Sequence, residues 1–136
     1  MDDLSSALQI SAAGMRAQSG RIRIVAENVA NANSTAETAD ADPYRRQVPV
    51  FAQYLDRGTG ARLVEVSRVA LDPSDFALKY DPSHPAADNE GYVKLPNVNP
   101  LIEMMDLREA QRSYEANLGA LDSARAMAAA TLKILE

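Results

Sequence analysis

The chain has 136 residues, of which 46% are hydrophobic, and its 19 acidic and 14 basic side chains give a formal net charge of −5. With no cysteine and a single histidine, disulfides, thiolate metal sites and multi-histidine metal sites are excluded, so we expect no metal and no other cofactor. The acidic balance argues against a surface of clustered lysine and arginine, and nucleic acid is therefore not an expected partner.

No stretch of the sequence approaches the roughly 20 consecutive apolar residues that span a bilayer, so we expect no direct membrane span. The first residues include Asp2 and Asp3, where a secretory signal would be basic, and no apolar segment of the signal type follows. These features predict a chain that stays in the cytoplasm or leaves the cell without a cleaved signal peptide.

Prolines and aromatic residues divide the chain into parts. All seven prolines lie between positions 43 and 100, and six of the seven aromatic residues lie between positions 44 and 92. Because proline disrupts helices, the proline-free ends predict two long helices around an irregular β segment. We therefore predict a mainly α fold with a small β insert, divided into an N-terminal helix (1–33), a linker (34–43), a β-rich insert (44–99) and a C-terminal helix (100–136).

The N-terminal segment carries a heptad-like pattern, which predicts a helix of about 45 Å from about residue 4 to residue 33. Seven of nine positions spaced alternately by four and three residues are apolar in the series Leu4, Leu8, Ser11, Met15, Gln18, Ile22, Val25, Val29 and Ala32. Asparagines and Ser34 follow, and these residue types commonly end helices.

The C-terminal segment repeats this pattern between Leu107 and Leu135. Its seam consists of Ala110, Tyr114, Asn117, Leu121, Ala124, Ala128 and Thr131, with Leu118 and Leu132 beside it. Asn99 and Pro100 predict the N-cap and the first helical residue, and Glu103 lies near the positive end of the helix dipole. The two seams predict long N- and C-terminal helices that pair as a coiled-coil-like hairpin.

Such a helical hairpin leaves its outer apolar positions uncovered. The middle segment is too short and too polar to wrap around helices of about 45 to 50 Å, so we expect no third layer within the chain. Packing against further copies or other chains is the expected way of covering these positions.

The middle segment predicts strands and turns. Val48–Leu55 and Ala61–Leu71 have mostly β-like spacing and are separated by a turn at 57–60, which predicts a hairpin. Phe76–Tyr80 and Tyr92–Leu95 are two further short strands. The acidic stretch from Ser34 to Asp42 has few large apolar residues and predicts a mobile linker.

No set of residues in the sequence supports catalysis, and we expect a protein that is not an enzyme. His84 lies in a proline-rich loop with Asp81 and Asp88 nearby but without a second histidine, which favours a structural or solvent-exposed role. The acidic residues between positions 72 and 90 do not fit a calcium-binding EF-hand loop, and the sequence has no glycine-rich phosphate loop and no nucleophile elbow.

Polar residues in two places favour contacts with other chains. The adjacent Arg45 and Arg46 leave two alternatives, docking onto an acidic partner surface or a charged strand edge that discourages unwanted pairing. Asparagine is a poor interior-helix residue, and a buried polar group at a seam specifies register, which is more useful to an assembly than to an isolated hairpin. The residues concerned are Asn28, Asn31, Asn33 and Asn117.

Four motifs resemble those of bacterial flagellar rod and hook proteins. The N-terminal motif comprises residues 11–18 and 26–33, and the C-terminal motif comprises residues 103–106 and 110–117. Between them, residues 43–47 and the runs 80–85 and 91–99 are similar to one branch of this family, the proximal rod proteins. The motifs follow the expected order, and the resemblance covers nearly the whole chain.

This resemblance implies a structural subunit of the flagellar basal-body rod, the drive shaft that crosses the periplasm and transmits motor torque to the hook. In this family the N- and C-terminal helices of neighbouring subunits pack into an inner tube, and the β insert lies outside it. Family members leave the cell through the flagellar type III export apparatus without a cleaved signal. The implied partners are therefore other rod proteins, copies of this chain and the export apparatus.

Carried over by motif, the resemblance implies that residues of both core-tube helices form subunit interfaces. The polar and aromatic residues concerned are Asn28, Asn31, Asn33, Tyr114 and Asn117. The packing residues concerned are Leu8, Met15, Ile22, Val25, Val29, Leu118 and Leu121. The alternative from another class is a soluble coiled-coil adaptor protein whose β insert binds a partner.

Overall fold

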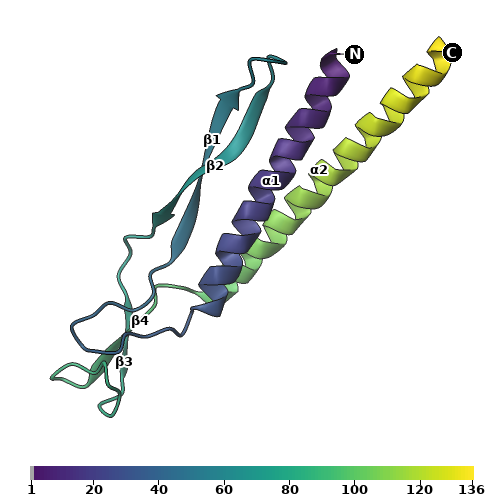
Figure 1. Cartoon of the computed structure of the whole chain (residues 1–136). Coiled ribbons are helices and arrows are strands. Elements are labelled where there is room, and N and C mark those ends of the chain that lie inside the picture. The colour runs from purple at the N-terminus through teal and green to yellow at the C-terminus, as the bar shows by residue number, and fades with distance from the viewer. Residues whose placement is uncertain (1) are drawn as a thin grey trace. The chain divides into compact units, whose positions relative to one another are not determined.

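The computed structural model describes residues 2–136, which form two long helices and four strands (Figure 1). Helix α1 spans Asp2–Ala30 and helix α2 spans Pro100–Leu135. The strands are β1 (Gln47–Leu55), β2 (Arg62–Leu71), β3 (Ala77–Tyr80) and β4 (Tyr92–Leu95), and β1–β2 and β3–β4 each form a two-stranded sheet. The predicted class, mainly α with a small β insert, is confirmed.

Side-chain caps explain where the helices end and begin. At the end of α1, the carbonyl oxygen of Glu27 accepts from the backbone nitrogen of Asn31 at 3.0 Å and from Asn31 Nδ2 at 2.9 Å, which satisfies a carbonyl of the last turn. At the start of α2, the Asn99 side-chain oxygen accepts from the backbone nitrogen of Leu101 at 3.1 Å, as an N-cap does. No helix within residues 2–136 is long and apolar enough to cross a bilayer.

Contacts group the chain into two compact units, and neither unit is continuous in sequence. Unit 1 contains the residues up to Ile22, Pro49–Arg68 and Arg108–Glu136. Unit 2 contains Arg23–Val48 and Val69–Leu107. Both helices and both strands of the β1–β2 hairpin therefore contribute residues to each unit.

In unit 1, α1 and α2 pack together along the predicted seams. Gly14 of α1 lies against Asn117 of α2, and Arg21 Nη2 lies 3.4 Å from Glu109 Oε2. Of the predicted seam residues in the part of α2 that belongs to unit 1, those buried or half-buried are Ala110, Tyr114, Asn117, Leu121, Ala124 and Ala128. The pairing of the two helices is confirmed, although the last seam positions, Thr131 and Leu135, are exposed.

The hairpin of unit 1 covers a second face of α1 (Figure 1). Ala13 of α1 forms a buried cluster with Ala61 and Leu63 of the hairpin, and Thr59 Oγ1 donates to Gln9 Oε1 at 2.8 Å. Because the helix presents a small side chain at Ala13, the strand can approach closely. The expectation that the middle segment supplies no further layer is therefore wrong for this unit.

The turn of this hairpin lies where the sequence predicts it. The backbone nitrogen of Asp56 donates to the carbonyl oxygen of Ala61 at 2.9 Å, and the nitrogen of Gly60 donates to the carbonyl oxygen of Asp56 at 2.7 Å. Gly60 has a φ of 72°, a conformation that residues with a Cβ rarely adopt. Glycine at this position thus allows the chain to reverse.

In unit 2, strands β3 and β4 pair antiparallel, with Ala77 opposite Leu95 and Tyr80 opposite Tyr92. The rings of Tyr80 and Tyr92 meet edge to face, with their centroids 5.4 Å apart. Gly91 has a φ of 87°, and a Cβ there would lie 2.8 Å from Tyr80 Cε2. The two short strands predicted from the sequence are confirmed, and glycine lets the loop close under the tyrosine ring.

The stretch 34–43 has no helix or strand, but it makes defined contacts within unit 2. The backbone nitrogen of Tyr44 donates to the carbonyl oxygen of Ser34 at 3.1 Å, which closes the stretch into a loop. Thr35 Oγ1 lies 3.2 Å from His84 Nε2, and His84 Nδ1 accepts from the backbone nitrogen of Ala86 at 3.0 Å. These contacts give His84 a structural role between two loops.

Candidate functional site

In unit 2, Asn28 joins the end of α1 to the start of β1. Its side chain is almost fully buried, with 1% exposure. Asn28 Oδ1 accepts from the hydroxyl of Tyr44 at 2.8 Å and from the backbone nitrogen of Gln47 at 2.9 Å. Asn28 Nδ2 donates to the carbonyl oxygen of Gln47 at 2.8 Å and to Glu103 Oε2 at 3.3 Å. All four hydrogen-bonding positions of the amide are therefore used.

Glu103 connects the first turn of α2 to the same place. Its carboxylate has an exposure of 0%, and Arg46 Nε donates to its Oε1. Arg46 Nη1 also lies 3.2 Å from Asp72 Oδ2, so the guanidinium is shared by two carboxylates. A buried carboxylate is tolerated when a cation and further donors replace its water, and here Arg46 and Asn28 do so.

Asn97 completes the arrangement on the other side of Arg46. Asn97 Oδ1 accepts from the backbone nitrogen of Arg46 at 2.7 Å, and Asn97 Nδ2 donates to the carbonyl oxygens of Asp72 at 3.1 Å and Ser74 at 3.2 Å. The backbone nitrogen of Asp72 donates to the carbonyl oxygen of Arg46 at 2.8 Å. We call the resulting cluster the polar junction, and its members are Asn28, Tyr44, Arg46, Asp72, Asn97 and Glu103.

The electrostatics of the polar junction favour its charged arginine and aspartate. Burial lowers the pKa of Arg46, but the hydrogen bond and charge of Glu103, followed by those of Asp72, outweigh it and raise the pKa above its usual value. Hydrogen bonds from Ser74 lower the pKa of Asp72, and Arg46 lowers it further. Burial raises the pKa of Tyr44, and the charges of Glu27 and Glu103 add to this effect. The phenol of Tyr44 thus stays a neutral donor to Asn28.

The neighbouring Arg45 also binds within unit 2. Its guanidinium carbon lies 4.2 Å from the centroid of the Phe76 ring, and its Nη1 donates to the carbonyl oxygens of Asp72 at 2.8 Å and Ser74 at 3.0 Å. Neither of the two alternatives for the arginine pair, partner docking or a charged strand edge, describes these contacts. Both arginines hold the segment before β1 in place.

The chemistry of the polar junction is that of a structural site. Its charged groups pair with one another, and its amides bind backbone and side-chain partners. Within residues 2–136 no group of three or more histidine or acidic side chains could hold a metal ion. The arrangement fixes the end of α1, the start of β1 and the start of α2 in one geometry.

A second site of close contact joins the helices in unit 1. A Cβ on Gly14 would lie 2.7 Å from Asn117 Oδ1 and 2.8 Å from Asn117 Cγ. Asn117 Nδ2 donates to the carbonyl oxygen of Ser113 at 2.9 Å, which holds the side chain against its own helix. Glycine at position 14 therefore allows the two helices to approach, and both residues belong to the motifs that carry the family resemblance.

The structure separates the twelve predicted interface residues by exposure. Val25 and Asn28 are buried within the chain. The half-buried residues are Leu8, Met15, Ile22, Asn31, Tyr114, Asn117 and Leu121. The exposed residues are Val29, Asn33 and Leu118. Asn28 already has its partners inside unit 2, and a role in subunit contacts stays a prediction for all twelve.

Sequence reasoning missed the roles of Arg46, Asp72, Asn97 and Glu103. One signal was available, because Glu103 is an acidic residue within the apolar run from Leu101 to Met105. An acid in such a run requires a cation if it is buried, and the arginine pair at 45–46 supplies one. Arg46 and Glu103 lie 57 positions apart in the sequence, and sequence spacing does not reveal a pairing over this separation.

Comparison with known proteins gives matches along the whole chain. Residues 89–134 match the family model described as flagellar basal body rod FlgEFG protein C-terminal. The chain is 50% identical over 136 residues to the flagellar basal-body rod protein FlgC of Agrobacterium fabrum (strain C58 / ATCC 33970), with coverage of 100% of this chain and 98% of that relative. The proteins of the same name from Borreliella burgdorferi and Bacillus subtilis are 40% and 38% identical, covering 98% and 93% of this chain and 98% and 95% of their own length.

Proposed function

The chain belongs to the FlgC family of flagellar basal-body rod proteins, and we propose that it serves as a structural subunit of the proximal rod. In this function, copies of the chain assemble helically with other axial proteins into the drive shaft that transmits motor torque to the hook. The observation that carries the proposal is the identity of 50% over 136 residues with the rod protein of A. fabrum.

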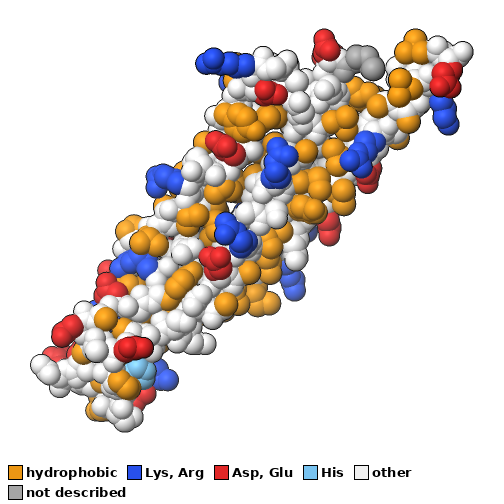
Figure 2. All heavy atoms as spheres, viewed as in Figure 1, with side chains coloured by type: hydrophobic (Ala, Val, Ile, Leu, Met, Phe, Trp, Pro, Cys, Tyr) orange, Lys and Arg blue, Asp and Glu red, His pale blue; other side chains and the backbone are white. Residues whose placement is uncertain are grey.

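Exposed apolar side chains on α2 support assembly. Figure 2 shows hydrophobic side chains at the molecular surface along this helix. The large apolar residues exposed in the part of α2 that belongs to unit 1 are Leu118, Met127, Leu132, Ile134 and Leu135. Large exposed apolar side chains in this number are typical of a helix that contacts other chains, and packing in a rod would bury them.

The polar junction supports a mechanical role. A shaft that transmits torque needs subunits whose elements keep their geometry under load. In unit 2, Asn28, Arg46 and Glu103 connect three elements through buried hydrogen bonds and an ion pair. Networks of this kind are rigid when every member has a partner.

We also propose that the chain occupies the rod in the periplasmic space and arrives through the flagellar type III export apparatus without cleavage. In α1, Gln9 and Ala13 contact the hairpin of unit 1, so removal of a segment that includes them would remove part of the core. Mass spectrometry of the chain from purified basal bodies tests this point. Peptides that contain Asp2 and Asp3 are expected, and a mature chain that begins after Ala13 would contradict it.

A soluble coiled-coil adaptor protein is not favoured. The A. fabrum and B. burgdorferi relatives, which cover 100% and 98% of this chain, are both named as basal-body rod proteins. An adaptor would also leave the apolar residues of α2 exposed in its working state, which is unfavourable in water.

Deletion of the coding sequence, followed by electron microscopy of basal bodies, tests the proposed function. We expect non-motile cells whose basal bodies lack a complete rod and hook. Re-expression of the unaltered chain is the control and is expected to restore both. Intact rods and hooks in the deletion strain would overturn the proposal.

A further inference from the structure

Unit 2 contains a pocket on one face of the β3–β4 sheet. Its volume is about 300 Å³, at the lower end of the range of sites that enclose an organic ligand, about 300 to 1,000 Å³. Val93 and Leu95 of β4 contribute apolar side chains to its lining, and Lys79 of β3 lines it as well. Lys79 lies opposite Val93 in the antiparallel pair, so both side chains are on the same face of the sheet. We call this feature the insert pocket.

Two charges of opposite sign line the insert pocket without pairing. Lys79 is exposed and Asp81 is half-buried, and neither forms an ion pair in the part of the chain that the structure describes. Asp81 Oδ1 accepts from the hydroxyl of Ser83 at 2.8 Å, whereas Oδ2 has no hydrogen-bond partner within residues 2–136. Residues two positions apart along an extended chain are separated by about 7 Å. The pocket therefore offers a cation and an anion a short distance apart.

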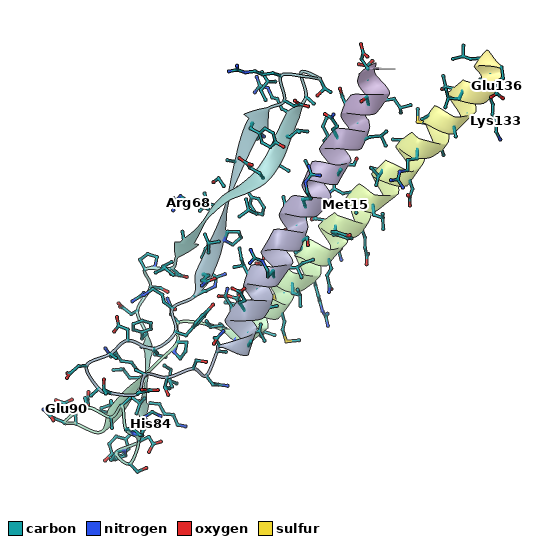
Figure 3. All side chains as sticks on the ribbon, viewed as in Figure 1. Met15, Arg68, His84, Glu90, Lys133 and Glu136 are labelled. Atoms are coloured by element: carbon teal, nitrogen blue, oxygen red, sulfur yellow. The ribbon has the colours of Figure 1, made fainter. Side chains whose placement is uncertain are left out.

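The loop at 34–43 adds a hydroxyl donor to the same pocket. His84 lies in the loop after β3 (Figure 3), and because its Nδ1 accepts from the backbone nitrogen of Ala86, the proton of the neutral imidazole is on Nε2. Nε2 therefore donates to Thr35 Oγ1, which lies 3.2 Å away. The hydroxyl hydrogen of Thr35 then has no acceptor among the described residues. Thr35 and His84 both line the insert pocket, so this hydrogen is available to a ligand.

We propose that the insert pocket binds the zwitterion of a free amino acid with an apolar side chain. Lys79 and the hydroxyl of Thr35 donate to the carboxylate of the ligand, and Asp81 accepts from its ammonium group. The apolar side chain of the ligand packs against Val93 and Leu95. The inference goes beyond the proposed function and does not depend on it.

A ligand with a single charge fits the insert pocket less well. A carboxylate or a phosphate alone would pair with Lys79 but would also lie near the carboxylate of Asp81. A cation alone would pair with Asp81 but would lie near the ammonium group of Lys79. Like charges at such distances repel. An amino acid carries both charges close together and gives each of them a partner of opposite sign.

The single histidine gives a direct measurement of binding, because His84 lines the insert pocket and no other imidazole is present. The probe is leucine, which is added to the purified full chain at constant pH while the imidazole proton signals are followed by NMR. We expect a saturable shift with a dissociation constant of about 0.1 to 10 mM, as is ordinary for so small a ligand.

Two analogues of leucine test the requirement for both charges in the unaltered chain. N-acetylleucine has no ammonium group, and leucinamide has no carboxylate. Each is expected to bind at least about tenfold more weakly than leucine, because one charged hydrogen bond is lost and one charge of the pocket is left facing the ligand without a partner.

Variants of the two charged residues test the same site from the side of the protein. Lys79→Gln and Asp81→Asn are each expected to weaken leucine binding about tenfold. Circular dichroism checks that both variants fold. Lys94→Gln is the matched control, since Lys94 lies opposite Leu78 on the other face of the sheet, and its exposed ion pair with Asp42 contributes little to stability. The affinity for leucine should be unchanged in this control.

Any of three results would overturn the proposed site. The first is the absence of a saturable shift of the His84 signals with leucine. The second is equal affinity of the unaltered chain for leucine and its two analogues, and the third is unchanged affinity in both Lys79→Gln and Asp81→Asn. None of these results bears on the rod, so the inference and the proposed function fail separately.

Discussion

At the scale of single residues, Glu103 places the strictest requirement on its surroundings, because its carboxylate is fully buried. It lies in a helix turn otherwise rich in exposed apolar residues, and it is buried against Arg46 and Asn28. The helix-dipole role predicted for Glu103 follows from its place in the first turn of α2. Its partners come from α1 and the segment before β1, which sequence spacing does not reveal.

Replacing Glu103 by glutamine should destabilise the chain strongly. The change removes the negative charge beside Arg46 but keeps the shape of the side chain, and we expect a loss of about 2 to 4 kcal/mol in the free energy of unfolding. The value is at the lower end for a broken buried pair because Asp72 remains beside Arg46. Urea unfolding measures it.

The matched control is Glu109→Gln on the same helix. The Glu109 side chain is 71% exposed and its contact with Arg21 is 3.4 Å long, so a change of about 0 to 1 kcal/mol is expected. Equal losses for the two variants would show that burial of Glu103 has no energetic consequence.

Asp72 should make the stability depend on pH in the acidic range. Its pKa in the folded chain lies below the usual 3.8, since Ser74 and Arg46 stabilise the carboxylate. A lowered folded-state pKa gives a contribution that is complete above about pH 5 and is lost as the pH falls through the folded-state value. Unfolding in urea between pH 7 and pH 3 should therefore show a smaller loss for Asp72→Asn than for the unaltered chain. Parallel curves would refute this assignment.

At the scale of helices and strands, local sequence patterns were sufficient for most elements. The seam residues predicted both helices, and Asn99 caps the start of α2 at Pro100 as predicted. Helix α1 ends at Ala30, three residues before the predicted end at residue 33, because residues 31–33 form a turn. Turn residues placed the β1–β2 hairpin within one residue at each strand end, with β1 at Gln47–Leu55 and β2 at Arg62–Leu71. These features depend on residues that are close together in the sequence, so one sequence is sufficient to predict them.

The layer formed by the β1–β2 hairpin was not predictable in the same way. Its core consists of Ala13, Ala61 and Leu63, which are small or ordinary apolar residues without a distinctive pattern. Ala13 lies outside the heptad seam, on another face of α1. Alanine is common on both buried and exposed helix faces, so its presence did not predict that this face is covered. Contacts between residues about 50 positions apart decide this packing, such as that of Thr59 with Gln9.

The contact between α1 and α2 predicts opposite effects for two helical glycines. Gly14→Ala would bring a Cβ to 2.7 Å from Asn117 Oδ1, and we expect a loss of about 1 to 3 kcal/mol in the free energy of unfolding. Gly119→Ala meets nothing within 4 Å and should stabilise the chain by about 0.5 to 1 kcal/mol through helix propensity.

A double-mutant cycle identifies the contact responsible. Asn117→Ala removes the side chain that a methyl group at position 14 would meet, so the double variant Gly14→Ala/Asn117→Ala should lose less than the sum of its parts. Thermal unfolding of the four proteins measures the difference. Additive losses of stability would show that contact with Asn117 does not cause the destabilisation by Gly14→Ala.

At the scale of the whole molecule, assembly is best tested at residues that the folded chain exposes. Val25 is a predicted interface residue, but it is 1% exposed in the single chain. A charge at Val25 would unfold the chain whether or not an assembly forms. Ile134 is 84% exposed, so a change there separates an effect on assembly from an effect on folding. It follows Lys133, which Figure 3 shows near the end of α2.

Ile134→Asp should leave folding intact and block incorporation into the rod. We expect a change of no more than about 0.5 kcal/mol in the free energy of unfolding, because the side chain has little contact in the single chain. In cells the variant should fail to restore swimming, since a charge would be placed in an apolar interface. Ile134→Leu is the control and should swim normally. Normal swimming by Ile134→Asp would remove this end of α2 from the interface.

Electron cryomicroscopy of purified basal bodies is the most direct measurement of the central claim that this chain is a building element of the rod. We expect density for the chain in the wall of the proximal rod, with α1 and α2 packed against neighbouring subunits and the apolar side chains of α2 covered. A rod whose density is fully explained by other proteins, with this chain absent, would contradict it.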